Sequence, residues 1–97
     1  MPVTVLALLT VCDENPAALA AYFQGALPLL ERVGARIVKR FEINEVVVGH
    51  RPARTLMLVE YPDRAAVDAV FGSEEYRRLI PIRDQAFTNY SVTVVSD

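Results

Sequence analysis

Cysteine and histidine are scarce in this chain of 97 residues. The single cysteine, Cys12, can form no internal disulfide and cannot supply a thiolate cluster for zinc. A chain with so little cysteine fits a reducing compartment, and we expect a cytoplasmic protein. The lone histidine, His50, cannot provide a two-histidine metal site. We therefore expect no metal, haem or other cofactor.

Long apolar runs and an excess of one charge are also missing. The longest apolar stretch, residues 3–12, is about half the ~20 residues that a transmembrane helix needs, and no lysine or arginine precedes it as in a signal peptide. Lysine and arginine number 10 against 12 aspartates and glutamates, which excludes a basic nucleic-acid binder. We expect neither a membrane nor a nucleic acid as partner.

The chain has no internal repeat, no linker rich in glycine, serine or proline, and no run of like charge. It also lacks a glycine-rich phosphate loop and the HExxH, CxxC and GxSxG motifs. Hydrophobic residues make up 53% of the chain, enough for one compact core. We therefore expect one domain, residues 1–97, without a self-evident catalytic signature.

Four segments have the pattern of β-strands. Residues 3–12 and 55–61 are apolar on both alternating faces, which is typical of central strands covered on both sides. Residues 35–48 carry several charged side chains and suit the edge of a sheet. Residues 90–95 alternate apolar and polar, as in a strand with one buried face. The turn signal at 49–53 predicts a hairpin between the second and third strands.

Helical segments separate these strands. Asn15 is suited to cap a first helix that Gly34 ends. Asp63 is suited to cap a second helix, and Ser73 a further helical stretch that reaches about residue 89. The element order is therefore βαββαβ.

This order predicts an α+β, ferredoxin-like fold, a four-stranded antiparallel sheet with residues 3–12 and 55–61 in the middle. Right-handed crossovers place the helices on one face of the sheet. The other face of the two apolar strands would expose an aliphatic patch larger than soluble monomers usually show. We therefore expect a homodimer, in which a second copy covers this patch.

Several short motifs, most specific between residues 49 and 83, carry a family resemblance. They are Tyr-Pro-Asp at 61–63, Ala-Ala at 65–66, Phe-Gly-Ser-Glu-Glu-Tyr at 71–76 and Pro-Ile-Arg at 81–83. With them the chain resembles, over nearly its whole length, the domain-of-unknown-function family numbered 1330 in the dimeric α/β-barrel superfamily. The resemblance implies a homodimer whose two sheets face each other as a barrel. Relatives include cofactor-free monooxygenases, muconolactone-type isomerases and dye-peroxidase-like haem proteins, so the resemblance implies no single reaction.

The chain departs from the family pattern at two places. It has Gly-Ala-Arg at 34–36 where the family tends to have Gly-Gly-Arg, and Val-Gly at 48–49 where the family tends to have Glu-Gly. An acid that acts at the second place in relatives is missing or displaced in this chain.

Arg83 is the most informative candidate residue. Helical spacing places it within the apolar stripe of the last helix, where a guanidinium loses water and needs a partner. Glu60, the one acid within the doubly apolar strands, is the predicted partner in a structural ion pair. The alternative is that Arg83 binds a ligand carboxylate or enolate.

His50 and the aromatic residues are further candidates. His50 lies in a Gly/Pro turn and could act as a general base, although histidines in surface loops are common. Aromatic residues such as Phe23 and Tyr76 either line a pocket or simply form the core.

The sequence thus favours a small dimeric α/β-barrel protein that binds a small organic acid or carbonyl compound between sheet and helices. Cofactor-free isomerase- or monooxygenase-like chemistry would be its enzymatic form. The candidate binding residues are Arg83, Tyr76, Phe23 and Glu60, with His50 as the catalytic base. A cavity of ~300 Å³ or more on which Arg83 and His50 converge would favour this hypothesis. A filled cavity would favour the alternative, a non-catalytic interaction or stress-associated module.

Overall fold

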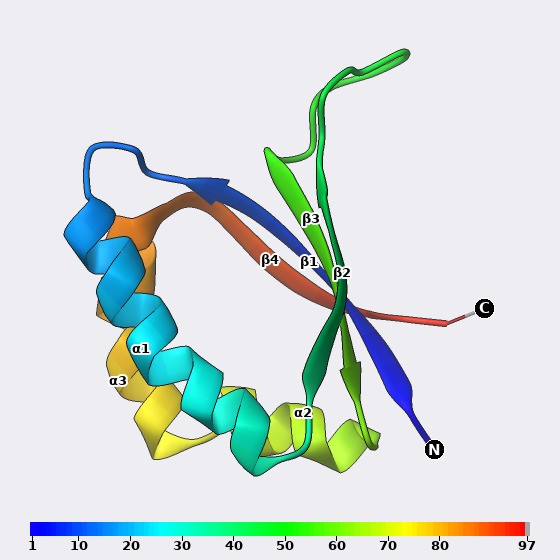
Figure 1. Ribbon diagram of the computed structural model, residues 1–97, viewed down its shortest axis with the longest axis vertical. Coiled ribbons are helices and arrows are strands. Elements are labelled where there is room, and N and C mark those ends of the chain that lie inside the picture. Colours follow the sequence, from blue (N-terminus) through cyan, green and yellow to red (C-terminus); the bar gives the residue numbers. More distant parts are fainter. Residues whose placement is uncertain (97) are drawn as a thin grey trace.

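The computed structural model describes residues 1–96 and contains the predicted order of elements. They are β1 (Val3–Val11), α1 (Pro16–Arg32), β2 (Arg36–Glu42), β3 (Thr55–Tyr61), α2 (Arg64–Phe71), α3 (Glu74–Ala86) and β4 (Phe87–Val95). The helices lie on one side of a single four-stranded sheet (Figure 1). The ferredoxin-like α+β fold is therefore confirmed.

The sheet has the order β2-β3-β1-β4, and all neighbouring strands are antiparallel. The two doubly apolar strands are central, as predicted. Val5 lies opposite Val59 and Val94, and these residues face the helices. Leu6 lies opposite Leu58, and side chains of this second set face away from the helices because successive residues of a strand alternate. We call this second surface the open face.

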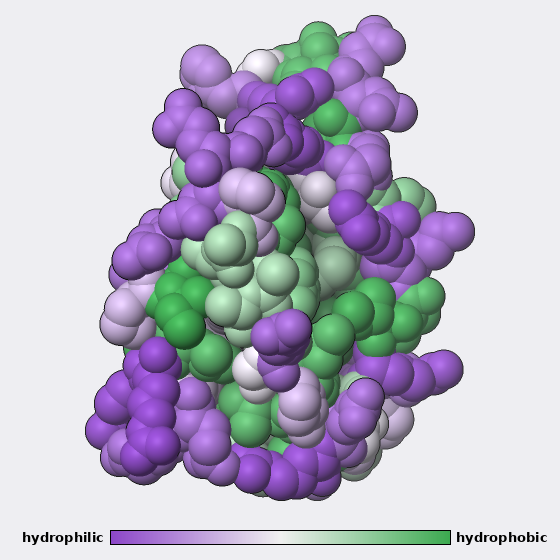
Figure 2. Space-filling view, turned by 60° about the vertical axis from the view of Figure 1, so that its left-hand side comes forward, coloured by the Kyte–Doolittle hydropathy of each residue, from purple (hydrophilic) through white to green (hydrophobic). Residues whose placement is uncertain are grey.

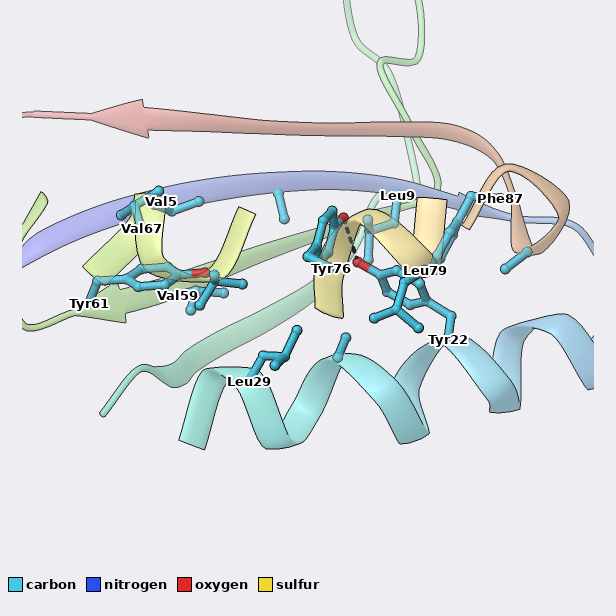
Figure 3. Packing of buried hydrophobic residues seen from close by; sticks show 14 of the residues in the cluster. Val5, Leu9, Tyr22, Leu29, Val59, Tyr61, Val67, Tyr76, Leu79 and Phe87 are labelled. Carbon is cyan, nitrogen blue, oxygen red and sulfur yellow. Dashed lines mark hydrogen bonds between the residues drawn. The ribbon is translucent and has the colours of Figure 1, made fainter. Parts of the chain in front are cut away.

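The hydrophobic core fills the space between the sheet and the helices (Figure 3). Val5, Val59 and Tyr61 enter it from the central strands, and Leu29 enters it from α1. Val67 adds a contact from α2. Within residues 1–96, no helix has both the length and the apolar character that crossing a membrane would require.

The predicted helix caps are present. Each capping side chain accepts a hydrogen bond from a backbone N–H of the first turn, which would otherwise have no partner inside the helix. The pairs are Asn15 with Ala18 (3.2 Å), Asp63 with Ala66 (2.8 Å) and Ser73 with Tyr76 (3.1 Å). Gly34 follows α1 with a φ of +78°, a backbone conformation that favours glycine and ends the helix.

The second strand is shorter than the sequence predicts. It ends at Glu42 because its last partner, Thr55, is the first residue of β3. The expected strand residues 43–48 instead belong to a loop, 43–54, that projects beyond the sheet (Figure 1). Val47 and Val48 are 88% and 90% exposed, and apolar atoms are visible on the projecting part of the surface (Figure 2).

The last helix is also shorter than predicted. It ends at Ala86, and β4 begins at Phe87 rather than at residue 90. The Ala86 carbonyl accepts a hydrogen bond from Cys12 N–H at 2.8 Å, and Phe87 pairs with Val11. Pairing with β1 thus holds this segment in the extended conformation of a strand, although its local sequence has a helical pattern.

Close packing between α1 and α3 depends on Gly25. A methyl group at this position would lie 2.5 Å from Cδ2 of Leu79 and 3.2 Å from its Cδ1. Leu79 is buried, so it has little room to move away.

We expect Gly25→Ala to lower the free energy of unfolding by about 1–3 kcal/mol, because overpacking outweighs the ~1 kcal/mol that alanine gains in a helix. Urea unfolding measures the change. The double variant Gly25→Ala/Leu79→Ala should be more stable than the two single effects predict, because it removes the collision. An increase in stability for Gly25→Ala alone would contradict this packing.

Candidate functional site

Three tyrosine hydroxyls meet inside the core. Tyr22 comes from α1, Tyr76 from α3 and Tyr90 from β4. The Tyr22 hydroxyl lies 2.9 Å from that of Tyr76 and 2.6 Å from that of Tyr90, and the last two are 3.3 Å apart. Figure 3 shows the contact between Tyr22 and Tyr76. In such a triangle each hydroxyl can donate one hydrogen bond and accept another.

Burial favours the neutral form of two of these phenols, Tyr22 and Tyr90. Desolvation raises the pKa of Tyr22 and of Tyr90 well above the ordinary value, and the neighbouring tyrosines act in the same direction on balance. Burial also raises the pKa of Tyr61 to about 12. At neutral pH the hydroxyls of Tyr22, Tyr90 and Tyr61 are therefore protonated.

Arg83 lies beside this cluster, on the last turn of α3. Its Nη1 donates to the Tyr76 hydroxyl at 3.3 Å, and its guanidinium carbon is 5.2 Å from the centre of the Tyr90 ring. Its Nη2 is 3.5 Å from a carboxylate oxygen of Asp84, a largely exposed residue. The Arg83 side chain itself is 25% exposed. Within residues 1–96 these contacts occupy only part of its fork of N–H donors.

Arg83 and Tyr90 line an open groove of about 380 Å³ between α2 and β4. Its polar lining also includes Ser91 and the residues Arg64 and Asp68 of α2. The last two form an ion pair at 2.9 Å, so their charges offset each other. Arg83 therefore supplies the positive charge that is most available to a molecule in the groove.

A second, smaller hollow lies deeper, between the sheet and the helices. Its volume is about 50 Å³, and its lining is almost entirely apolar, with Phe23, Tyr61 and the three clustered tyrosines among its residues. Sites for drug-sized ligands have roughly 300 Å³ or more. The cavity predicted between sheet and helices thus exists, but it is too small to hold a whole ligand of that size.

The structure separates the predicted site residues. Tyr76 does contact Arg83, whereas Phe23 lines the deep hollow and not the groove. His50 is exposed in the projecting loop, away from α3 (Figure 1), and lines neither hollow. The two residues expected to converge, Arg83 and His50, therefore do not.

The predicted ion pair between Arg83 and Glu60 is wrong. Glu60 accepts from Nη2 and Nε of Arg36 at 3.3 and 3.4 Å, across the β2–β3 pair. Its neighbours Val59 and Tyr61 are buried beneath the helices, so strand alternation directs Glu60 to the open face.

Sequence reasoning missed the tyrosine cluster, although a signal for it was present. Tyr22 and Tyr76 fall on the apolar stripes of two helices. A buried tyrosine hydroxyl needs a hydrogen-bond partner, and core positions offer few polar groups. Several tyrosines expected in one small core therefore indicate that their hydroxyls bond to one another.

No group of three or more histidine, cysteine, aspartate or glutamate side chains within residues 1–96 is placed to hold a metal ion.

Comparison with known proteins places the chain in a family. The family model described as "Domain of unknown function (DUF1330)" matches residues 4–97. No curated protein matches the chain.

Solved structures share the fold at low sequence identity. A protein of unknown function from Rhodopseudomonas palustris is 21% identical, with a TM-score of 0.81 over 99% of this chain and 82% of the other. A dimeric protein of unknown function with a ferredoxin-like fold from Bacteroides fragilis is 11% identical, with a TM-score of 0.60 over 99% and 96%. An antibiotic biosynthesis monooxygenase is 20% identical, with a TM-score of 0.60 over 100% and 98%. These likenesses show the fold alone.

Proposed function

We propose that this chain, which belongs to the DUF1330 family of domains of unknown function, binds a small organic acid or carbonyl compound at Arg83. One observation carries the proposal: a partly buried guanidinium with uncommitted donors faces a groove of about 380 Å³. Partly desolvated charges are usually paired within the protein, so open donors here favour an anionic partner from solution. A planar guanidinium matches a carboxylate through two parallel hydrogen bonds.

The tyrosine hydroxyls extend this chemistry to carbonyl oxygens. Tyr90 lines the groove, and burial raises its pKa, so its hydroxyl is neutral at neutral pH. When Tyr90 accepts from both Tyr22 and Tyr76, its own O–H is free to donate to an oxygen in the groove. A donor beside a fixed positive charge stabilises an oxygen that gains negative charge, as in an enolate. Cofactor-free isomerase- or monooxygenase-like chemistry would use this arrangement, and the shared fold with an antibiotic biosynthesis monooxygenase supports that form of the proposal.

Arg83→Met tests the binding site. We expect the substitution to weaken the binding of a monocarboxylate such as butanoate by roughly 10–100-fold, since hydrogen bonds to a charged group contribute ~1.5–3 kcal/mol. The melting temperature of the ligand-free protein should change little, because methionine fills similar space and removes a partly desolvated charge. Arg83→Lys should also weaken binding, because a point charge replaces the fork.

Titration calorimetry and thermal unfolding measure both effects. Arg78→Met on the exposed side of α3 is the matched control and should bind like the wild type. Equal binding by Arg83→Met and the wild type would contradict the proposal.

The second candidate function is a non-catalytic interaction module. The small size of the deep hollow and the exposed Val47 and Val48 in the projecting loop favour it. In that case Arg83 only supports Tyr76 and Tyr90, so Arg83→Met alone should lower the melting temperature, and no small acid should raise it.

We also propose that the protein is a homodimer that uses the open face. The middle of this face carries aliphatic side chains that remain partly exposed, from Leu6 and Leu8 of β1 and Leu56 and Leu58 of β3. Figure 1 shows the helices on the other side of the sheet, so they leave this face uncovered. The protein from Bacteroides fragilis, which shares the fold, is dimeric, and this supports self-association of the present chain.

A further inference from the structure

The groove and the deep hollow are separated by a shared wall. Phe71, Tyr90 and Val92 line both of them. We propose that Phe71 is a movable partition, and that the ligand is a monocarboxylate with a short aliphatic tail. Its carboxylate binds Arg83 in the groove, and its tail passes Phe71 into the deep hollow. This inference rests on the proposed function, because it needs the carboxylate on Arg83.

Of the three shared wall residues, Phe71 is the least constrained by its contacts. The Tyr90 hydroxyl is tied to the hydroxyls of Tyr22 and Tyr76 at 2.6 and 3.3 Å. Val92 is β-branched and belongs to β4, so its side chain is stiff. Phe71 is the last residue of α2, is partly exposed, and holds its place only by apolar contacts such as the edge-to-face contact with Tyr76 at 4.9 Å between ring centres.

The size and lining of the hollow select the tail. An engineered apolar cavity of roughly 150 Å³ holds a benzene ring, so a hollow of about 50 Å³ admits a short alkyl chain but not a ring. A polar tail would lose its water, and within residues 1–96 every buried side-chain nitrogen or oxygen already has a hydrogen-bond partner. A dicarboxylate is therefore excluded from this mode of binding, and an aliphatic monocarboxylate fits it.

The experiment measures affinity against chain length by titration calorimetry, with the full chain and straight-chain monocarboxylates from propanoate to octanoate. We expect wild-type affinity to rise about fourfold for each methylene that enters the hollow, the factor equivalent to ~0.8 kcal/mol per buried CH₂. The rise should stop once the hollow is full. Phe71→Ala should improve the binding of 3-phenylpropanoate relative to the wild type, because it removes the partition.

Two variants that close the hollow should abolish the dependence of affinity on chain length, while the binding that remains still depends on Arg83. Ala26→Leu fills the hollow from α1, and Phe71→Trp thickens the partition from the partly exposed side. Ala20→Leu, on the exposed surface of the same helix, is the matched control and should keep the dependence. Phe71→Trp provides the same test if Ala26→Leu does not fold.

The outcomes separate this inference from the function on which it rests. Wild-type affinity that depends on Arg83 but not on chain length would overturn the two-compartment ligand and leave the carboxylate site intact. Absence of any Arg83-dependent binding across the series would overturn the carboxylate site, and the inference with it.

Discussion

Leu58→Asp is expected to convert a homodimer into monomers. Leu58 lies near the middle of the open face, opposite Leu6 in the register of β1 and β3. In a dimer that buries this face, the new carboxylate would have no partner and would lose its water, which costs several kcal/mol. The dissociation constant should therefore rise roughly a hundredfold or more, since ~1.4 kcal/mol corresponds to a factor of ten.

Light scattering at micromolar concentration measures the assembly directly. Leu27→Asp makes the same chemical change on α1, at the edge of the deep hollow on the helical side of the sheet, and should leave the protein dimeric. A wild-type protein with the mass of one chain would refute the dimer. A Leu58→Asp variant with unchanged mass and unchanged melting temperature would show that another surface holds the copies together.

Local patterns predicted the elements better than their ends. The caps at Asn15, Asp63 and Ser73 act through neighbouring backbone atoms, so nearby sequence contains the information they need. The end of β2 and the start of β4 depend instead on where the partner strand stops or begins. Pairing between separate segments of the chain determines both boundaries, and no local sequence pattern contains this information.

The candidate site could be predicted only in part, because it too depends on how distant segments of the chain come together. Arg83 was identified from helical spacing alone, and the structure does bring it to Tyr76 and to a groove. Glu60 was assigned as its partner although the alternation of β3 between two buried neighbours already directs Glu60 to the other face. The position of His50 depends on the path of a long loop, which residue types do not specify.

The second large expected effect is a loss of folding stability at alkaline pH. The pKa of Tyr22 and that of Tyr90 are raised by burial far above the ~10 of an exposed tyrosine, and that of Tyr61 is raised to about 12. A raised folded-state pKa contributes stability that is present below pH ~10 and is lost as the pH rises, because the unfolded chain releases its protons first. Each of these tyrosines should therefore lower the free energy of unfolding by ~1.4 kcal/mol per pH unit above pH ~10.

Urea unfolding at intervals of about one pH unit between pH ~9 and ~12 measures this loss of stability. The ultraviolet absorbance of tyrosinate is followed in the same samples. The composition makes the test clean, because the chain holds 4 tyrosines but only 1 cysteine and, as Lys39, a single lysine. Tyr90→Phe should reduce the slope by about one tyrosine's share, since it removes one titrating group from the cluster. Tyrosinate absorbance that develops near pH 10 in the folded protein, with no loss of stability, would contradict the buried hydroxyl cluster.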